Sequence, residues 1–215
     1  MYDATGIVPL EGRDELPFAT LHKEPLFLHS VRTLLARDRG SGPVVTVDPH
    51  QRERAEKELA RHRLDVRVAE GTTWWESLSP GKATGAIVLL DPLCPLVPQR
   101  FVDTMLARLA GSPSTALAAF RPITDTIKTV ADHQIMGTID RDDFAIITSP
   151  VVIPAGIVGA EAPPVRDFAE LVGWLRGRAR LDLVRAPSMA RRVDDDSAVS
   201  LLECVDELGR TVHES

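Results

Sequence analysis

Charged residues that suit phosphate chemistry gather in one stretch of the chain, TDTIKTVADHQIMGTIDR at residues 124–141. It holds a carboxylate, Asp125, and two cations, Lys128 and Arg141, within two short β-branched runs around a polar turn. A second stretch, GIVPLEGRDELPF at residues 6–18, stands where a phosphate-binding loop would follow a strand, but it is poor in glycine and has no Lys. A phosphate cradle needs backbone amides that an anion can approach closely, which glycine permits. The sequence therefore predicts one half of a phosphate-handling site and an altered second half.

The elements that must position these residues follow a regular alternation. Short runs rich in Val, Ile or Leu, bounded by Gly, Pro or Asp, are typical of strands buried on both faces. Strands are expected at residues 5–10, 43–48, 65–70, 86–91, 115–120 and 181–186. Helices are expected at residues 25–35, 51–63, 102–109, 166–180 and 193–208, with a loop at 159–165. This pattern predicts an α/β fold with a doubly wound, mostly parallel, Rossmann-like sheet in a single domain over residues 1–215.

A β-rich insertion interrupts this alternation. The runs TIKTVAD (126–132) and IMGTID (135–140) can pair as a hairpin with a polar turn, and FAIITS (144–149) follows as a third strand. So few apolar residues cannot form a separate core. We therefore expect a projecting β-arm at about residues 124–150 that packs on something else.

Composition limits the classes of function. The chain has 25 basic and 31 acidic residues and a formal net charge of −6, so no basic stripe is available for a nucleic-acid partner. No run approaches the roughly 18 apolar residues of a membrane span, so no membrane partner is expected. Cys94 and Cys204 fit neither a disulfide framework nor a zinc site, and no His residues have metal-ligand spacing. We expect a cytoplasmic protein that holds no metal of its own.

Taken in order, these elements resemble the methylerythritol phosphate cytidylyltransferases of isoprenoid synthesis and their relatives, the ribitol-phosphate cytidylyltransferases. The resemblance is strongest at the Asp-Thr-Ile-Lys run of residues 125–128 and at the Thr-Ile-Asp-Arg run of residues 138–141. It implies that Asp125 is a catalytic acid on the substrate side and that Thr126 and Lys128 bind the substrate. It also implies that the arm swaps across a homodimer, where Arg141 reaches the substrate phosphate of the neighbouring subunit.

Softer similarities surround these two motifs. The stretch EGTTWWESL (70–78) keeps a Gly and a Ser, LLDPLCPLVP (89–98) keeps an Asp, TSPV (148–151) keeps a hydroxyl, and ARRVDDD (190–196) has an Arg where the family has a Lys. The resemblance implies catalytic cations at Arg13 and Arg192, substrate binding by Asp91 and Ser149, and nucleotide binding by Gly12, Gly71 and Ser77. CTP, a phosphorylated polyol and Mg²⁺ are the expected ligands if the protein is active.

The nucleotide side departs from the family. The loop PLEGRDELPF (9–18) keeps one glycine, carries Glu11, Asp14 and Glu15, and has Phe18 in place of the catalytic Lys. Cytidylyl transfer depends on cations and backbone donors that stabilise the charge of two polyanions. Because loss of a single such donor typically costs about 10²–10³ in rate, the altered loop predicts weak CTP chemistry.

Simpler roles remain open for the arm residues and for two tryptophans. Asp125 and Lys128 can form an ion pair at a strand end, and Arg141 can be a solvated hairpin residue. Trp74 and Trp75 can stack on a base, although capping the sheet is the simpler role.

Two further groups have similar alternatives. Cys94 follows a strand as a nucleophile would, but its apolar neighbours favour a buried thiol. The triplet at residues 194–196 resembles a metal-binding acidic run, yet its place before a helix favours capping.

Three functions are compatible with these observations. We favour a family member with reduced or absent nucleotidyl transfer that acts as a binding or dimerisation partner, either as a homodimer or as a heterodimer with an active paralogue. The second is an active cytidylyltransferase that uses CTP and a sugar- or alditol-phosphate, with Arg13 and Arg192 as its cations. The third is a glycosyltransferase or a molybdopterin-type nucleotidyltransferase on the same sheet, against which the motifs at 125–128 and 138–141 argue.

Overall fold

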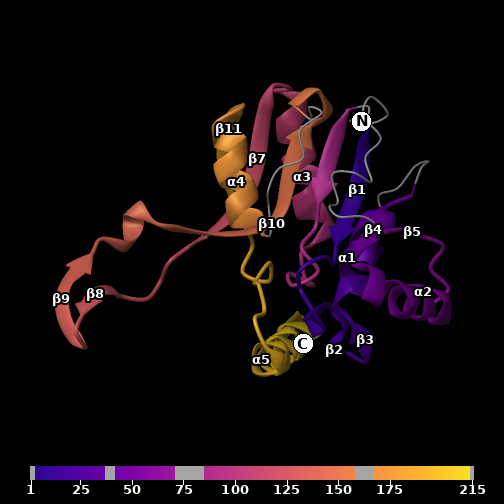
Figure 1. Cartoon of the computed structure of the whole chain (residues 1–215), viewed down its shortest axis with the longest axis horizontal. Helices are drawn as coiled ribbons and strands as arrows, with labels where there is room; N and C mark the ends of the chain where they lie inside the picture. The colour runs from indigo at the N-terminus through magenta and orange to yellow at the C-terminus, as the bar shows by residue number, and fades with distance from the viewer. Residues whose placement is uncertain (1–2, 37–41, 71–84, 158–166, 214–215) are drawn as a thin grey trace.

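The computed structural model describes residues 3–36, 42–70, 85–157 and 167–213. A seven-stranded sheet forms its centre, with the strand order β11-β7-β10-β6-β1-β4-β5 (Figure 1). Its strands are β1 (Ala4–Pro9), β4 (Val44–Val47), β5 (Arg67–Glu70), β6 (Ala86–Leu89), β7 (Thr115–Pro122), β10 (Ala145–Pro154) and β11 (Arg180–Arg185). Every pairing is parallel except those of β10, which runs antiparallel to both β6 and β7. The predicted doubly wound, mostly parallel α/β sheet is confirmed.

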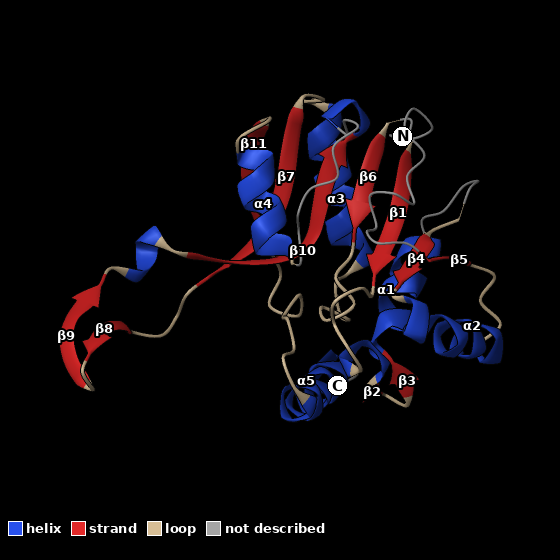
Figure 2. Cartoon of the chain, viewed as in Figure 1, coloured by secondary structure: helices blue, strands red, loops and turns tan. Residues whose placement is uncertain are grey.

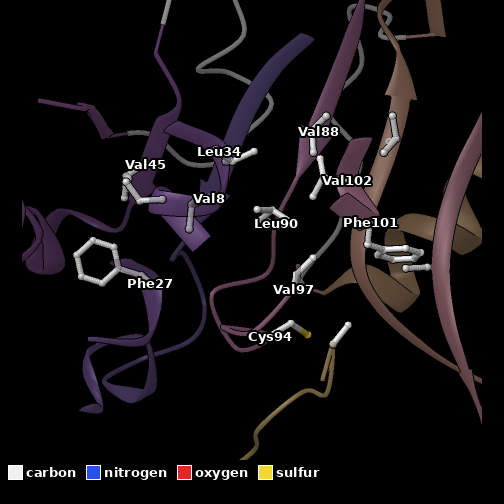
Figure 3. Packing of buried hydrophobic residues seen from close by; sticks show 14 of the residues in the cluster. Val8, Phe27, Leu34, Val45, Val88, Leu90, Cys94, Val97, Phe101 and Val102 are labelled. Carbon is white, nitrogen blue, oxygen red and sulfur yellow. The ribbon is translucent and has the colours of Figure 1, made fainter. Parts of the chain in front are cut away.

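Helices cover both faces of the sheet because its central strands bury alternate side chains on each side (Figure 2). One face packs against α1 (Leu26–Leu35), α2 (Arg52–Arg61) and α3 (Gln99–Ala110), and the other packs against α4 (Phe168–Arg176). Figure 3 shows the first core, where Phe27 and Leu34 of α1 face Val8 and Val45, and where Val102 of α3 lies near Val88. The buried faces of these helices match the apolar positions expected from their 3.6-residue period.

Strand β10 runs further than the sequence indicated. The strand expected at residues 144–149 continues to Pro154, and Val151 to Pro154 pair with β6 in the centre of the sheet. Pro150 interrupts the apolar run and obscured this continuation, because proline inside a run usually argues against a central strand. The register shifts between Ile147 and Val151, which accommodates the proline.

The predicted arm is present as a separate two-stranded hairpin of β8 (Ile127–Ala131) and β9 (Gln134–Ile139). It projects away from the sheet (Figure 1). Its apolar side chains face solvent, with Ile135 and Met136 exposed by 70% and 67%. Within the described residues, no helix is long and apolar enough to cross a membrane.

A third unit lies at the end of the sheet where β1 and β6 finish (Figure 1). It consists of helix α5 (Asp196–His213) and a short hairpin of β2 (Thr20–Leu21) and β3 (Glu24–Pro25) that the sequence did not predict. Asp195 accepts a hydrogen bond from the amide of Ala198 at 2.7 Å. This contact supports the expected capping role of the acidic triplet.

Candidate functional site

Charged loops meet at the carboxyl ends of the parallel strands. Residues 10–15 follow β1, Asp48 follows β4 and Asp91 lies just beyond β6. In open α/β sheets ligands bind outside the carboxyl ends of the strands, so this is where a nucleotide would be received. The sequence-predicted residues Gly12, Arg13, Asp91, Ser149 and Arg192 come together here.

Arg13 and Arg192 both pair with Asp91. The Nε atom of Arg13 lies 3.0 Å from Oδ1 of Asp91, and the two side chains are only 7% and 4% exposed. The Nε atom of Arg192 lies 3.5 Å from Oδ2 of Asp91, and its Nη1 atom pairs with Asp194. Arg13 also donates from Nη1 to the carbonyl of Glu11 at 2.9 Å, and its guanidinium lies 5.9 Å from the ring centroid of Phe168. Both predicted catalytic cations are thus neutralised within the chain.

Hydrogen bonds also fix the backbone around Asp91. Oδ1 of Asp91 accepts a hydrogen bond from the amide of Leu93 at 3.1 Å, and the Asp91 amide donates to Oγ of Ser149 at 3.0 Å. Both Asp91 and Ser149 are buried. The Asp91–Ser149 hydrogen bond joins the loop after β6 to β10.

Gly12 forms part of a backbone turn in this chain. Its φ of +68° lies in the left-handed region that glycine adopts without strain. Its amide donates to Oδ2 of Asp48 at 3.0 Å, and the next amide, of Arg13, donates to the carbonyl of Leu10 at 3.3 Å. These two amides therefore already have acceptors, whereas a phosphate cradle requires amides that point at the anion.

Two residues that the sequence did not assign to the site hold this loop. The Nε2 atom of Gln51 donates to the carbonyl of Asp14 at 2.8 Å, and its Oε1 atom accepts from the amide of Asp48 at 3.1 Å. An acceptor residue followed three positions later by Gln is a recognisable helix-start pattern. That pattern could have located Asp48 and Gln51, but not their contact with residues 12–14.

Glu11 places a carboxylate inside the same loop. One oxygen, Oε2, accepts a hydrogen bond from Thr46 at 2.7 Å, whereas Oε1 is buried with no hydrogen-bond partner. Desolvation by burial is the largest influence on this group and raises the pKa of Glu11 above its ordinary value of 4.5. In its ionised form, this carboxylate would repel a triphosphate.

Phe18 occupies a packed position. It is 4% exposed and meets the ring of Phe27 edge to face, with centroids 5.5 Å apart and planes at 65°. The guanidinium of Arg54 lies over its other side, 4.3 Å from the ring centroid. A residue in this environment contributes apolar burial, whereas the Lys that it replaces would bring a charge.

Cys94 is confirmed as a buried thiol. It is fully buried, and its Sγ atom lies 3.3 Å from Oγ1 of Thr148, which donates to the carbonyl of Ala190 at 2.8 Å. Burial raises the pKa of Cys94 to about 12, so the nucleophilic thiolate is scarce near neutral pH. The alternative role as a nucleophile therefore receives no support.

The predicted substrate-side residues lie on or beside the arm. Asp125, Thr126, Lys128 and Arg141 are all exposed. Lys128 donates from Nζ to Oγ1 of Thr138 at 2.6 Å across the hairpin, and Arg141 donates from Nη1 to the carbonyl of Thr124 at 2.6 Å. Lys128 thus contacts Thr138 within the described residues, and no ion pair with Asp125 forms there. Because the arm projects away from the sheet, these groups are separated from the Arg13–Asp91 pair of their own chain (Figure 1).

Some predicted residues cannot be placed. Gly71 and Ser77, and with them Trp74 and Trp75, lie outside the described residues.

The residues at the carboxyl ends of the strands do not fit a protein-held Mg²⁺ ion. Mg²⁺ needs oxygen ligands in nearly octahedral geometry. Both carboxylate oxygens of Asp91 face guanidinium groups, and Oδ2 of Asp48 accepts the Gly12 amide. Within the described residues, no group of three potential ligands includes Asp48 or Asp91.

A doubly wound sheet with helices on both faces and charged loops at the carboxyl ends of its strands defines a Rossmann-like α/β protein. A family model described as 2-C-methyl-D-erythritol 4-phosphate cytidylyltransferase matches residues 11–160. Because this match covers more than half of the sequence, the chain belongs to that family.

Individual relatives agree with this assignment. A 2-C-methyl-D-erythritol 4-phosphate cytidylyltransferase from Bacillus pumilus (strain SAFR-032) is 22% identical over 171 residues, which are 76% of this chain and 72% of the relative. The crystal structure of 4-diphosphocytidyl-2C-methyl-D-erythritol synthase from Anaerococcus prevotii DSM 20548 matches with a TM-score of 0.72 at 11% identity, over 96% of this chain and 99% of that one. The crystal structure of 2-C-methyl-D-erythritol 4-phosphate cytidylyltransferase from Thermus thermophilus matches with a TM-score of 0.69 at 17% identity, over 96% and 100% of the two chains. The fold is shared, and the sequence has diverged widely.

Proposed function

We propose that this chain is a family member with reduced or absent nucleotidyl transfer that acts as a binding or dimerisation partner. The observation that carries the proposal is the buried ion pair between Arg13 and Asp91, 3.0 Å apart. A cation that neutralises a triphosphate must be available to it, but Arg13 is held by a carboxylate and Arg192 faces the same group. Freeing Arg13 would leave the buried Asp91 with only the more distant and more exposed Arg192 as its cation, which is unfavourable.

The residues around this pair also leave few groups to bind a triphosphate. The amide of Gly12 is used by Asp48, and Phe18 is packed in the core in place of the family's Lys. Catalysis of phosphoryl-type transfer is mostly positioning and electrostatic stabilisation, so the loss of several donors together is severe.

Two measurements with the purified chain test the proposal. Calorimetric titration with CTP and Mg²⁺ should give no binding heat up to millimolar CTP. Pyrophosphate release from CTP and methylerythritol phosphate should stay at background, with the Bacillus pumilus relative as the positive control. Turnover that an Asp125→Ala substitution abolishes would overturn the proposal, because it would assign activity to this chain's own site.

The exposed arm supports a partner role. The apolar side chains of Val130, Ile135 and Met136 face solvent on one short hairpin, and such side chains are commonly covered by another protein surface. We propose that the arm forms a homodimer or pairs this chain with an active paralogue, so that Arg141 acts in the partner's site. Co-expression with an active paralogue should yield a mixed dimer. Recovery of separate homodimers alone would rule out the heterodimer.

A second candidate is an active cytidylyltransferase that joins CTP to a sugar- or alditol-phosphate. The observation in its favour is that Arg13 and Arg192 converge on one carboxylate, so two cations already lie where a triphosphate would arrive. An acceptor panel tests this role. Pyrophosphate release with any acceptor that is lost in both Arg13→Gln and Arg192→Gln would support it, and release at background with every acceptor would exclude it.

A further inference from the structure

A second group of titratable side chains lies away from the Arg13–Asp91 pair, where the β2–β3 hairpin meets α5. His22 stands in the hairpin turn, and Glu203, Asp206 and Glu207 project from α5. Three of these residues, His22, Glu203 and Glu207, each offer one possible ligand atom, and the three atoms all lie within 4.8 Å of one another. In the described part of the chain, this is the one group of three or more His, Cys, Asp or Glu residues that meets such a limit.

The elements that carry these groups are fixed to one another. Leu21 and Leu26 flank the hairpin turn and pack with Val199 and Leu202 of α5 in a separate buried cluster. The amide of His22 also donates to Oε1 of Glu203 at 2.7 Å. Moving the hairpin from the helix would expose this cluster, so the donors are held close together before any ligand arrives.

The distances suit a small tetrahedral ion. Nδ1 of His22 lies 3.3 Å from Oε1 of Glu203, and bonds of about 2.0–2.1 Å in a tetrahedral zinc site place neighbouring ligands roughly 3.3 Å apart. Oε1 of Glu207 lies 4.0 Å from the same nitrogen. The Glu207 side chain is 65% exposed, so rotation about its own bonds can close the remaining distance. Glu203 and Glu207 are four residues apart and therefore share one face of α5.

The other nitrogen of the imidazole is already oriented. Nε2 of His22 lies 2.9 Å from Oδ2 of Asp206. Histidines that bind metal through one nitrogen almost always donate the other N–H to a carboxylate or carbonyl, which fixes the ring and its tautomer. Asp206 holds that place here, so Nδ1 is the nitrogen that faces the two glutamates.

We propose that His22, Glu203 and Glu207 form a binding site for a divalent transition-metal ion of the Zn²⁺ class, with Asp206 orienting the histidine and water as the fourth ligand. A mixed set of imidazole nitrogen and carboxylate oxygens favours zinc and neighbouring first-row ions over soft ions, which prefer thiolate ligands. The ion joins α5 to the hairpin that follows the residue 10–18 loop, and thereby stabilises this end of the molecule. The competing explanation is a set of His–carboxylate ion pairs without metal.

Zinc titration of the untagged, chelator-treated full chain distinguishes the two explanations. All variants carry Cys204→Ser, so that the exposed thiol on α5 contributes no zinc affinity. We expect one Zn²⁺ per chain by calorimetry, and a melting temperature that rises with Zn²⁺ concentration. His22→Gln should abolish both effects, and Asp206→Asn should weaken zinc binding by about 10–100-fold. His50→Gln, which changes an exposed histidine, should alter neither.

Two outcomes would overturn the site. Zinc binding at the same affinity in His22→Gln would place the ion elsewhere, and no stoichiometric binding by a folded parent protein would leave ion pairs only. Glu207→Gln provides a second variant if His22→Gln fails to fold, because its exposed side chain makes a smaller structural contribution. It too should weaken binding, and unchanged affinity would remove Glu207 from the site.

Discussion

The loop at residues 10–18 and the arm of β8 and β9 are both regions that the family resemblance made candidates for function, but they differ in how their side chains are placed. In the loop, Arg13 and the amide of Gly12 have partners within the same chain. On and beside the arm, Lys128 and Arg141 also have hydrogen-bond partners within the chain, but both are exposed, as are the apolar side chains of Ile135 and Met136. A region whose charges are already paired has little affinity to offer an anion. A region that exposes apolar side chains can gain free energy when another surface covers them.

The prediction with the largest expected effect removes the buried carboxylate of Asp91. Asp91→Ala leaves Arg13 as a buried cation without its paired carboxylate, so the free energy of unfolding should fall by about 3–5 kcal/mol. Urea denaturation measures the change. Asp182→Ala is the matched control, because its pair with Arg108 is partly exposed and should contribute about 1 kcal/mol or less. Equal effects of the two substitutions would mean that the Arg13–Asp91 pair is not the central contact of the loop.

Restoring the family's Lys should be nearly as costly. Phe18→Lys removes an aromatic ring from its contact with Phe27 and introduces an ammonium beside Arg54. We expect a loss of about 3 kcal/mol of unfolding free energy. Pyrophosphate release from CTP should stay at background. Normal stability together with new activity would contradict our view that this position has become part of the core.

Substitutions on the arm should weaken the association between chains and have little effect on the folding of the arm itself. If the arm forms the proposed dimer, Ile135→Asp or Met136→Asp should raise the dissociation constant of that dimer, because each removes a contact worth about 2 kcal/mol when buried. Sedimentation across a concentration series measures it. Thr129→Asp, at an exposed position on β8, provides a comparison on the same hairpin. Unchanged association in both apolar variants would show that the arm is not the dimer contact.

The smallest expected effect is a pH dependence in the loop. Burial raises the pKa of Glu11 in the folded protein above the ordinary value of 4.5. Below that value the group is protonated in both states. As the pH rises from about 4.5 through the raised pKa, the unfolded chain ionises first, and the native protein loses the stability that the bound proton contributed. Relative to Glu11→Gln, the unsubstituted protein should therefore become less stable as the pH rises through this range.

Urea denaturation of both proteins at several pH values measures this difference. Thr46→Val sharpens the test, because Thr46 donates the hydrogen bond that favours the charged form of Glu11. Its removal should widen the pH window. A native protein that gains stability over Glu11→Gln as the pH rises would reverse the sign and contradict the assignment.

Local patterns predicted most of the fold. The run at residues 86–91 is apolar and ends in Asp, and the structure has a buried strand at Ala86–Leu89 followed by Asp91. The hairpin of β8 and β9 was equally visible, because its two β-branched runs flank a polar turn. The central half of β10 escaped prediction because Pro150 interrupts its run, and the β2–β3 hairpin was too short to produce a periodic signal.

The candidate site was less predictable because its contacts span long separations in sequence. Arg13 and Asp91 were each expected to serve a ligand, and their mutual pairing joins loops 78 residues apart. No local pattern indicates that one predicted site residue will neutralise another. The packing of Phe18 against Phe27 is a similar case, since the sequence shows only that a Lys is missing.

The continuity of β10 has a mechanical consequence. Strands β7 and β10 lead into and out of the arm, and both continue into the central sheet, where β10 lies between β7 and β6. A pull on the arm therefore acts along two neighbouring strands. The hydrogen bonds between β10 and β6 lie across that direction, so they are loaded in shear and resist together rather than opening one after another. The force that the arm can bear when a bound partner pulls on it is thus set by the strand pairing of the central sheet and not by the small hairpin at the tip of the arm.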